Sequence, residues 1–413
     1  MKRYLVLTFL ILFAIAAMAQ QKDLDYFLQM ASQNSPLLKE YEDQAKANEL
    51  DSLLIRQNNG VHLDAFSAGS YAPVVNGWGY DAAITNIADV GALLSASKQI
   101  TGKRNLQNKL QSLQYQKQSV NISRKLTEQE LHKTITDQYI TAFGNYQLYQ
   151  SNKQMLETLK QQDVMVRKLT EEGVLRQTEY LSLLVNLHKQ ELLVSQLSAQ
   201  YRNDFGMLNY LCGIRDTAFI PLPAPDIAPD STFEPQSTYF FQQFTVDSLK
   251  LATDKASIDF DYQPKISLYA DAGYHSSFAV DPYKNLGASA GFTIAVPVYD
   301  GHQRKTRQEK VTIREKTRVQ YKDFFLDQYE QKIAMLEQQL RSAKELVKQA
   351  KEQVKFAKTL VEADNKLMNS GDISVTEYIL AINNYLEAKN TLIQQSVSEY
   401  QIINEINYWS RAR

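Results

Sequence analysis

Two glutamates at matching places in the chain are the side chains best placed to do chemistry. Glu179 lies six residues after Gly173, and Glu377 lies six residues after Gly371. Each belongs to a Thr-Glu-Tyr triplet at the same spacing from its glycine. A carboxylate in such a place stabilises the positive end of a helix that begins after the glycine. A role at the start of a returning helix is therefore the local interpretation of both residues.

The chain offers no candidate site for enzymatic chemistry. Its five histidines do not have metal-ligand spacing, and it has neither a phosphate-binding loop nor a nucleophile elbow. Cys212 is the only cysteine, so no intrachain disulfide forms, and we expect it to be a small buried hydrophobe. The formal net charge is −1 with both signs intermixed, which argues against a nucleic-acid partner. We expect no enzyme activity, no cofactor and no metal.

The sequence repeats itself at an offset near 200 residues. Gly371 follows Gly173 by 198 positions, and Gly301 follows Gly102 by 199. Matching landmarks in one order indicate a tandem duplication. The predicted organisation is a first repeat at 20–220, a linker at 221–236 that holds five of the ten prolines, and a second repeat at 237–413. Each repeat is expected to contain a helix, two strands and a long helical hairpin, with tips near 173 and 371.

Each repeat contains an unusually long stretch without helix breakers. The 69 residues from His302 to Ser370 include no Gly or Pro, and the stretch from Lys103 to Glu172 has only Gly144. A continuous helix of this size would be about 100 Å long at ~1.5 Å per residue. Apolar residues from Ile333 to Val361 alternate at spacings of three and four, as in helices that supercoil. A two-stranded coiled coil is the alternative to the wall of a tube. Three apolar residues beside this row widen it toward a second partner: Leu346, Phe356 and Leu360.

Alternating segments before each long helix predict four strands per chain. Lys265–Tyr274 and Gly287–Pro297 place apolar residues on one face and small or polar residues on the other. Their lengths match the ~9–11 residues that a tilted strand needs to cross a bilayer. His62–Tyr71 and Ala88–Gln99 are the weaker equivalents in the first repeat. A small soluble antiparallel sheet is the alternative, but one face is too polar for a soluble core.

The amino terminus predicts export from the cytoplasm. A Lys2-Arg3 start, an apolar stretch at 4–17 and an Ala17-Met18-Ala19 cleavage pattern indicate a signal peptide at 1–19. No other stretch is apolar enough for a transmembrane helix. Because four strands cannot close a membrane barrel, several copies must complete it. Two copies would give eight strands with a filled interior, whereas three would give twelve with room for a pore.

Several motifs carry a resemblance to a known family. The chain resembles the TolC-type outer-membrane efflux proteins over nearly its whole mature length, and the duplicated layout is the most specific feature. The Ser97–Gly102 junction departs from the pattern because it lacks the proline. The matching segments are Asn34-Ser35-Pro36, Val296-Pro297-Val298-Tyr299-Asp300-Gly301, Glu172-Gly173-Val174-Leu175 and Ser370-Gly371-Asp372-Ile373.

The resemblance implies a homotrimer whose twelve-stranded barrel spans the outer membrane above a periplasmic α-helical tunnel. It also implies that a periplasmic adaptor protein and an inner-membrane pump open the tunnel. In a trimer, Glu179 and Glu377 would each form a ring of three carboxylates, which attracts cations and serves as a candidate gate. The residues that would dock the adaptor are those of the two tips: Gly173, Val174, Leu175, Gly371, Asp372 and Ile373.

The predicted fold class is thus mainly α, with tandem long helices forming a tunnel and four membrane strands per chain. The expected function is a passive exit duct of a multicomponent efflux or secretion system. A soluble periplasmic coiled-coil scaffold or adaptor without a pore is the alternative. Adaptors usually contain a compact β module, and none is visible in this sequence.

Overall fold

The computed structural model describes residues 22–80, 88–216, 220–230, 233–277 and 281–410. The chain forms two compact units. The helix unit comprises the described residues of 1–39, 125–239 and 325–413, and the strand unit comprises those of 40–124 and 240–324. Each unit draws segments from both sequence repeats, whose boundaries remain a prediction. The predicted signal peptide lies outside the described residues.

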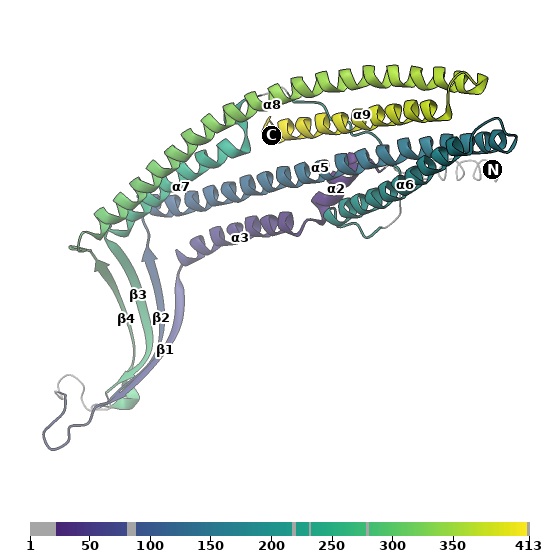
Figure 1. Cartoon of the computed structure of the whole chain (residues 1–413). Coiled ribbons are helices and arrows are strands. Elements are labelled where there is room, and N and C mark those ends of the chain that lie inside the picture. The colour runs from purple at the N-terminus through teal and green to yellow at the C-terminus, as the bar shows by residue number, and fades with distance from the viewer. Residues whose placement is uncertain (1–21, 81–87, 217–219, 231–232, 278–280, 411–413) are drawn as a thin grey trace, which may run out of the picture. The chain divides into compact units, whose positions relative to one another are not determined.

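The two long helices are continuous, as the absence of breakers predicted. Helix α5 spans Lys103–Glu171 and α8 spans Gln303–Ser370. Each is followed by a shorter antiparallel helix, α6 at Gln177–Leu211 and α9 at Val375–Ser410 (Figure 1). Within the described residues, every helix is too short or too polar to cross a bilayer as a single span.

Among the described residues, three shorter helices precede the strands, and the Asn34-Ser35-Pro36 motif separates the first two. Helix α2 spans Leu24–Asn34, α3 spans Pro36–Asn58 and α7 spans Tyr239–Asp261. The Ser35 hydroxyl accepts a hydrogen bond from Leu38 N–H at 3.4 Å. Pro36 is the first residue of α3, where a backbone N–H would have no partner within the helix, so the proline loses no hydrogen bond. The Asn34 amide donates to the Cys212 carbonyl at 2.9 Å, which ties this break to the end of α6.

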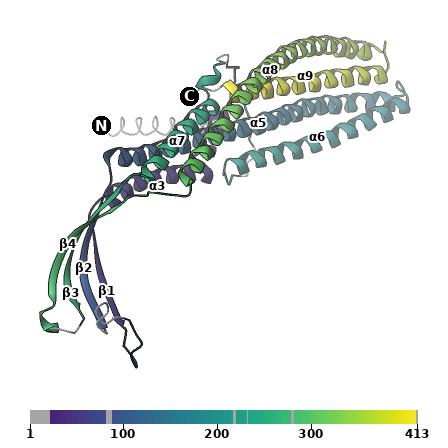
Figure 2. The ribbon, with the colours of Figure 1, turned by 90° about the vertical axis from the view of Figure 1, so that its left-hand side faces the viewer.

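Four strands form one antiparallel sheet in the order β1-β2-β3-β4. Figure 2 shows them side by side as long, curved ribbons. Two short 3-10 turns, at Pro235–Ser237 and Pro282–Lys284, precede α7 and β4. Four strands per chain were predicted, and the structure confirms them. The strands are β1 at His62–Tyr71, β2 at Ala88–Ile100, β3 at Lys265–Ser276 and β4 at Leu286–Ala295.

The register gives the sheet one polar and one largely apolar face. Asp64 pairs with Ser95, Ser95 with Asp271, and Asp271 with Ser289, so one polar row crosses all four strands. Neighbouring residues alternate between faces, so the adjacent row on the opposite face is apolar. That row consists of Leu63, Ala96, Ala270 and Ala290. Large apolar side chains are exposed on this face, including Leu63, Leu94, Leu268, Phe292 and Ile294.

Asp300 fixes the junction between β4 and α8. Its carboxylate accepts hydrogen bonds from His302 N–H at 2.9 Å and from Arg304 N–H at 2.7 Å. These are N–H groups that a helix start leaves without intrahelical partners. The Arg304 bond is the largest of the effects that lower the pKa of Asp300. The Asp300-Gly301 motif therefore caps α8, and Gly301 supplies the positive φ of +63° that the turn requires.

The first core of the helix unit includes a buried residue of the proline-rich linker. Residues from α2, α5 and α6 pack together with Leu222 of the linker. The Tyr139 hydroxyl donates to the Pro223 carbonyl at 2.9 Å, and Asn407 donates to the Ala228 carbonyl at 2.9 Å. Cys212 is fully buried in this core, and burial raises the pKa of its thiol to about 12. The linker is thus held against the helices by hydrogen bonds to its carbonyl groups.

Gly144 permits close contact between α5 and α9. A Cβ added at this position would lie 2.4 Å from Val397 Cγ2, and valine has little freedom to move away. We expect Gly144→Ala to destabilise the protein by about 1–3 kcal/mol despite its better helix propensity. Thermal unfolding followed by circular dichroism measures the change. Gly206→Ala is the matched control because a Cβ there meets nothing within 4 Å. Adding Val397→Ala to Gly144→Ala removes the methyl group that the new Cβ would meet, so the double variant should be more stable than Gly144→Ala alone. If it is not, the steric explanation is wrong.

Glu405 links α5, α8 and α9 through two lysines. It lies 3.1 Å from Lys133 Nζ and 3.2 Å from Lys332 Nζ, and it accepts a hydrogen bond from Trp409. Burial alone would raise the pKa of Glu405, but these hydrogen bonds outweigh it and lower the pKa below the usual 4.5. Because the pKa of Glu405 is lower in the folded state than in the unfolded state, the group stabilises the fold at pH values above its unfolded-state pKa. This stabilisation is lost as the pH falls through the folded-state pKa.

We expect Glu405→Gln to reduce stability by about 1 kcal/mol at neutral pH, since partial exposure screens the ion pairs. The difference from the unchanged protein should shrink below pH 4.5, where the carboxylate of the latter also becomes protonated. Melting curves at neutral and acidic pH test this. Exposed Glu352→Gln should show neither effect. A penalty for Glu405→Gln that is independent of pH would contradict the ion-pair interpretation.

Candidate docking tips and gate

The two helical hairpins end in the same turn geometry. At the first tip, Gly173 has φ +77°, and Val174 N–H donates to the Leu169 carbonyl at 2.8 Å. At the second, Gly371 has φ +81°, and Asp372 N–H donates to the Leu367 carbonyl at 2.9 Å. Each glycine N–H also donates to the carbonyl three residues earlier. Both tips are therefore Schellman turns that need glycine for their left-handed backbone.

The six predicted docking residues divide into an exposed set and a packed set. Gly173, Val174, Gly371 and Asp372 are exposed, and Val174 retains 67% of its accessible surface. Leu175 and Ile373 are only partly exposed because they pack against a buried cluster between the hairpins. The exposed four are free to meet a partner, whereas these two chiefly anchor the tips.

Both candidate gate glutamates cap the helices that return from the tips. The Glu377 carboxylate accepts hydrogen bonds from Ser374 N–H at 2.8 Å, while the Ser374 hydroxyl accepts one from Glu377 N–H at 3.2 Å. This reciprocal pair is a capping box. Glu179 accepts from Arg176 N–H at 3.1 Å, but arginine cannot return the bond, so only half of the box forms. The helix-start role is present at both sites.

A second apolar core holds the two hairpins together just above the tips. It joins residues of α5, α6 and α9, among them Val166, Leu183 and Tyr378. Asn383 of α9 donates to Asn186 of α6 at 3.4 Å. Asn186 is the tenth residue of α6 and Asn383 the ninth of α9, so these helices begin at nearly the same height. Because of this core, each tip is positioned by the other hairpin as well as by its own turn.

An arginine of α5 ties the first hairpin together. Arg167 donates to the Tyr180 hydroxyl of α6 at 2.9 Å and to Asp163 at 2.7 Å. The guanidinium can satisfy both acceptors at once because its donors form a planar fork. These bonds brace the start of α6 beside Glu179.

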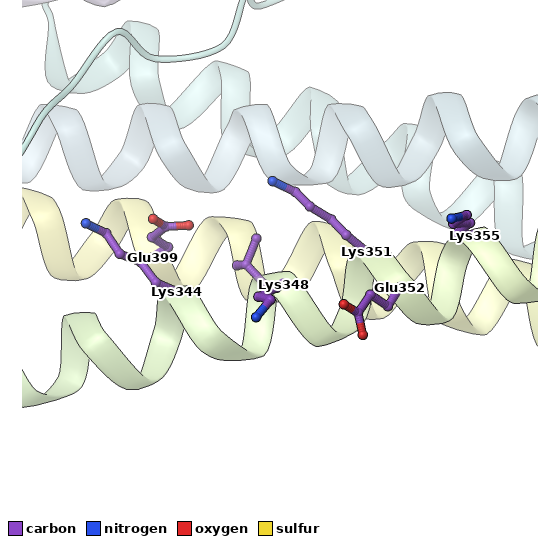
Figure 3. Close-up of a pocket in the computed structure, with 7 residues that line it drawn as sticks. Lys344, Lys348, Lys351, Glu352, Lys355 and Glu399 are labelled. Carbon is purple, nitrogen blue, oxygen red and sulfur yellow. The ribbon is translucent and has the colours of Figure 1, made fainter.

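A charged groove of about 460 Å³ lies between α8 and α9 farther from the tips. Figure 3 shows lysine ammonium groups and the carboxylates of Glu352 and Glu399 interspersed along it. Its lysines, at 344, 348, 351 and 355, follow one face of α8. Mixed charges on an open surface of this kind are typical of a solvated helix face. Across the residues that the structure describes, no group of His, Cys, Asp and Glu could hold a metal ion.

The same fold occurs in solved structures of outer-membrane proteins. The outer membrane protein VceC from Vibrio cholerae superposes with a TM-score of 0.76 at 12% identity, over 94% of this chain and 96% of VceC. The CmeC outer membrane channel of Campylobacter jejuni gives 0.71 at 14% identity, over 94% and 85%. The open state of the MtrE outer membrane channel of Neisseria gonorrhoeae gives 0.72 at 13% identity, over 94% and 88%.

This chain has the fold of an outer-membrane channel protomer. The fold predicted from the TolC-type resemblance is therefore confirmed. Neither a family model nor a curated protein matches the sequence. At these identities the likeness establishes the fold alone.

One surface near the tips was missed by the sequence analysis. Leu181, Val185 and Leu192 of α6 are exposed by 51%, 68% and 62%. Their spacing of four and seven residues is the signal that could have revealed them, since it places all three on one side of a helix. Helix α6 has apolar residues on more than one side, so the sequence alone did not separate this exposed stripe from the apolar stripe that faces the core.

Proposed function

We propose that this chain is the outer-membrane channel of a multicomponent efflux or secretion system. In this proposal three copies share one twelve-stranded barrel, and their helices form a tunnel in the periplasm. Substrates pass through passively from the periplasm to the exterior, so the chain is a conduit and not an enzyme. The likeness to outer membrane channels over 94% of the chain is the observation that carries the proposal.

The sheet supports assembly from several copies. Among the described residues, no strand pairs with the outer edge of β1 or of β4. Unpaired backbone groups in lipid cost several kcal/mol each, so an open four-stranded sheet is unstable in a bilayer. The exposed apolar face, with Phe292 at 68% and Leu63 at 64%, is suited to contact with lipid. Pairing β4 of one copy with β1 of the next would remove every free edge.

The polar face supports a water-filled interior. The row of Asp64, Ser95, Asp271 and Ser289 would face the inside of a closed barrel if the apolar face meets lipid. Six residues along β2 from Ser95, Asp89 pairs with His275 at 2.9 Å on the same face. Twelve strands leave an aqueous path, whereas eight would be filled by side chains. Three copies are therefore the arrangement that fits a duct.

The tips support a gated periplasmic end. Exposed Gly173, Val174, Gly371 and Asp372 would contact the adaptor, and an inner-membrane pump would deliver the substrate. Three copies would bring three Glu179 and three Glu377 carboxylates together around the tunnel, where they favour cations. In this proposal the same carboxylates also cap their helices, so gating involves movement of capped helix starts.

Conductance in planar bilayers tests the proposal. When the purified protein is added to one side of the bilayer, it should insert and form long-lived conducting channels. A protein that never inserts and remains soluble would favour the alternative, a periplasmic scaffold or adaptor without a pore. Deleting residues 62–71, the β1 strand, provides the control because it removes one edge of the sheet and should abolish conductance.

A further inference from the structure

A run of positive charge lies where β2 passes into the long helix α5. Residues 90–127 contain seven Lys and Arg residues and no Asp or Glu. The three that lie farthest along α5 each pair with a carboxylate: Lys117 with Glu49, Arg124 with Glu42 and Lys125 with Glu128. The four nearest the sheet are exposed, and none of them pairs with a carboxylate in the part of the chain that the structure describes. These four are Lys98, Lys103, Arg104 and Lys109.

Arg56 of α3 belongs to the same group. The ion pairs of Lys117 and Arg124 join α3 and α5 at places seven residues apart on both helices, so the two helices run antiparallel side by side. Another step of seven residues brings Arg56 to the height of residue 110, one residue beyond Lys109. Arg56 is exposed and forms no ion pair with the described residues. These five cations, here called the junction cations, lie around the place where β1 begins and β2 ends (Figure 1).

The other half of the sheet edge neutralises its cations within the chain. At the junction of β4 with α8, Arg304 pairs with Asp259 at 2.9 Å, and Arg307 pairs with Asp261 at 3.8 Å. Asp259 lies six residues before the start of β3, whereas the residue six before the start of β1 is Arg56. The first junction thus has a positive charge where the second has a negative one. Its charge is left to be balanced by an anion from outside the chain.

Lys98 indicates where that anion lies. It pairs in register with Leu268, and it is four residues from Leu94, so its side chain is on the apolar face of the sheet. The proposed function puts this face against lipid. Lys98 is the third residue from the end of β2, so its apolar stem can follow the face while its ammonium group reaches the headgroups. The surroundings of this cation are therefore phospholipid and not the interior of the pore.

The heights of the other junction cations fit the same layer. Lys103 and Arg104 are the first two residues of α5 and follow the end of β2 by three and four residues. Lys109 lies about 9 Å farther along the helix, at ~1.5 Å per residue. The headgroup layer is roughly 5–8 Å thick on each side of a bilayer. Long lysine and arginine side chains can therefore reach this layer from all of these positions.

We infer that the junction cations bind the headgroups of anionic phospholipids on the periplasmic side of the outer membrane. The inference rests on the proposed channel function, which supplies the membrane and its orientation. Ammonium and guanidinium groups donate charge-assisted hydrogen bonds to phosphate oxygens. A zwitterionic headgroup carries its own cation beside the phosphate, so a cluster of protein cations favours a headgroup with net negative charge. Each copy would then be anchored at a fixed depth by one side of its sheet.

The selectivity for boundary lipids tests this inference. The full-length protein is reconstituted in phosphatidylcholine vesicles with a trace of spin-labelled phosphatidylglycerol or spin-labelled phosphatidylcholine. Electron spin resonance measures the fraction of each label that is bound to the protein. At low salt we expect phosphatidylglycerol to associate at least about threefold more strongly. The preference should largely vanish at about 1 M salt, where the screening length falls to about 3 Å.

A triple variant and a matched control make the test specific. Lys98→Gln, Lys103→Gln and Arg104→Gln together should abolish the preference for phosphatidylglycerol. The control removes three exposed lysines of the helix unit, which changes the net charge by the same amount and should leave the preference intact. Equal loss in the variant and the control would overturn the inference. The control substitutions are Lys344→Gln, Lys348→Gln and Lys351→Gln.

The remaining outcomes separate this inference from the channel proposal. If the unchanged protein conducts but does not prefer phosphatidylglycerol, lipid binding by the junction cations is wrong and the channel proposal stands. A triple variant with an altered reversal potential and an unchanged lipid preference would put the cations in the pore, and one that loses the mass of three copies would put them between copies. Either result would overturn the inference. A protein that never enters the vesicles would remove the channel proposal itself.

Discussion

Replacing Gly371 with tryptophan is expected to abolish export while the three-copy assembly still forms. A Cβ added at Gly371 meets nothing within 4 Å, and the position is exposed, so a larger side chain can extend into solvent. The left-handed backbone, at φ +81°, adds a strain of about 1–2 kcal/mol for any residue with a Cβ. That cost is confined to the exposed turn of the tip. The large effect would arise because the indole occupies the surface where we propose that the adaptor docks.

Two matched variants separate bulk from backbone strain. Gly371→Ala carries nearly the same strain without the bulk, and it should retain most export. Gly77→Trp, in the β1–β2 connection, has the same φ of +81° and equally open surroundings, and it should export normally. Export by cells that lack their own copy is the measurement, with the assembly checked by mass. Full export by Gly371→Trp, or loss of export with Gly371→Ala, would contradict the docking proposal.

Glu377→Gln is expected to reduce cation selectivity about tenfold without destabilising the tip. Glutamine can keep the capping box, because its amide oxygen accepts the hydrogen bond from Ser374 N–H that the carboxylate accepts at 2.8 Å. The substitution removes only the charge. If three Glu377 carboxylates form a ring at the periplasmic end, the attraction for cations should fall with them.

Glu377→Ala is the companion variant because it removes both the charge and the cap. It should show the same loss of selectivity together with a loss of about 1 kcal/mol in stability. Reversal potentials in a salt gradient measure selectivity, and thermal unfolding measures the cap. Unchanged selectivity in Glu377→Gln, with a destabilised Glu377→Ala, would leave Glu377 as a capping residue and refute the gate.

The sequence predicted the large elements well because their signals are long. The stretch from His302 to Ser370 is continuous as α8, which begins one residue later, at Gln303. Strand β1 has the predicted ends, and β2 extends one residue beyond Gln99 to Ile100. Gly144 does not interrupt α5, and its close contact with Val397 explains why a glycine occupies this position. Periodicity over tens of residues outweighs a single unfavourable position.

The tips were predictable as turns but not in the orientation of each side chain. A glycine at the end of a helical pattern indicates a left-handed turn, and both Gly173 and Gly371 adopt one. Whether Leu175 and Ile373 point outward depends on the other hairpin, which packs against them. Local sequence carries no information about that contact.

Long-range hydrogen bonds were likewise out of reach of the sequence. The contacts of Tyr139 with Pro223 and of Glu405 with two lysines join segments far apart in the chain. The free row on α6 needed knowledge of which face α5 and α9 already cover. Where both partners of a contact lie close together in the sequence, as with Ser374 and Glu377, local residues carry the signal, and the helix-start role of Glu377 was predicted.

The mass of the mature protein extracted in detergent from the outer-membrane fraction tests the central claim most directly. A shared barrel predicts a particle in that fraction with close to three times the mass of one protomer. A monomer or dimer in the soluble periplasmic fraction would contradict the channel and leave a coiled-coil scaffold as the function of this fold.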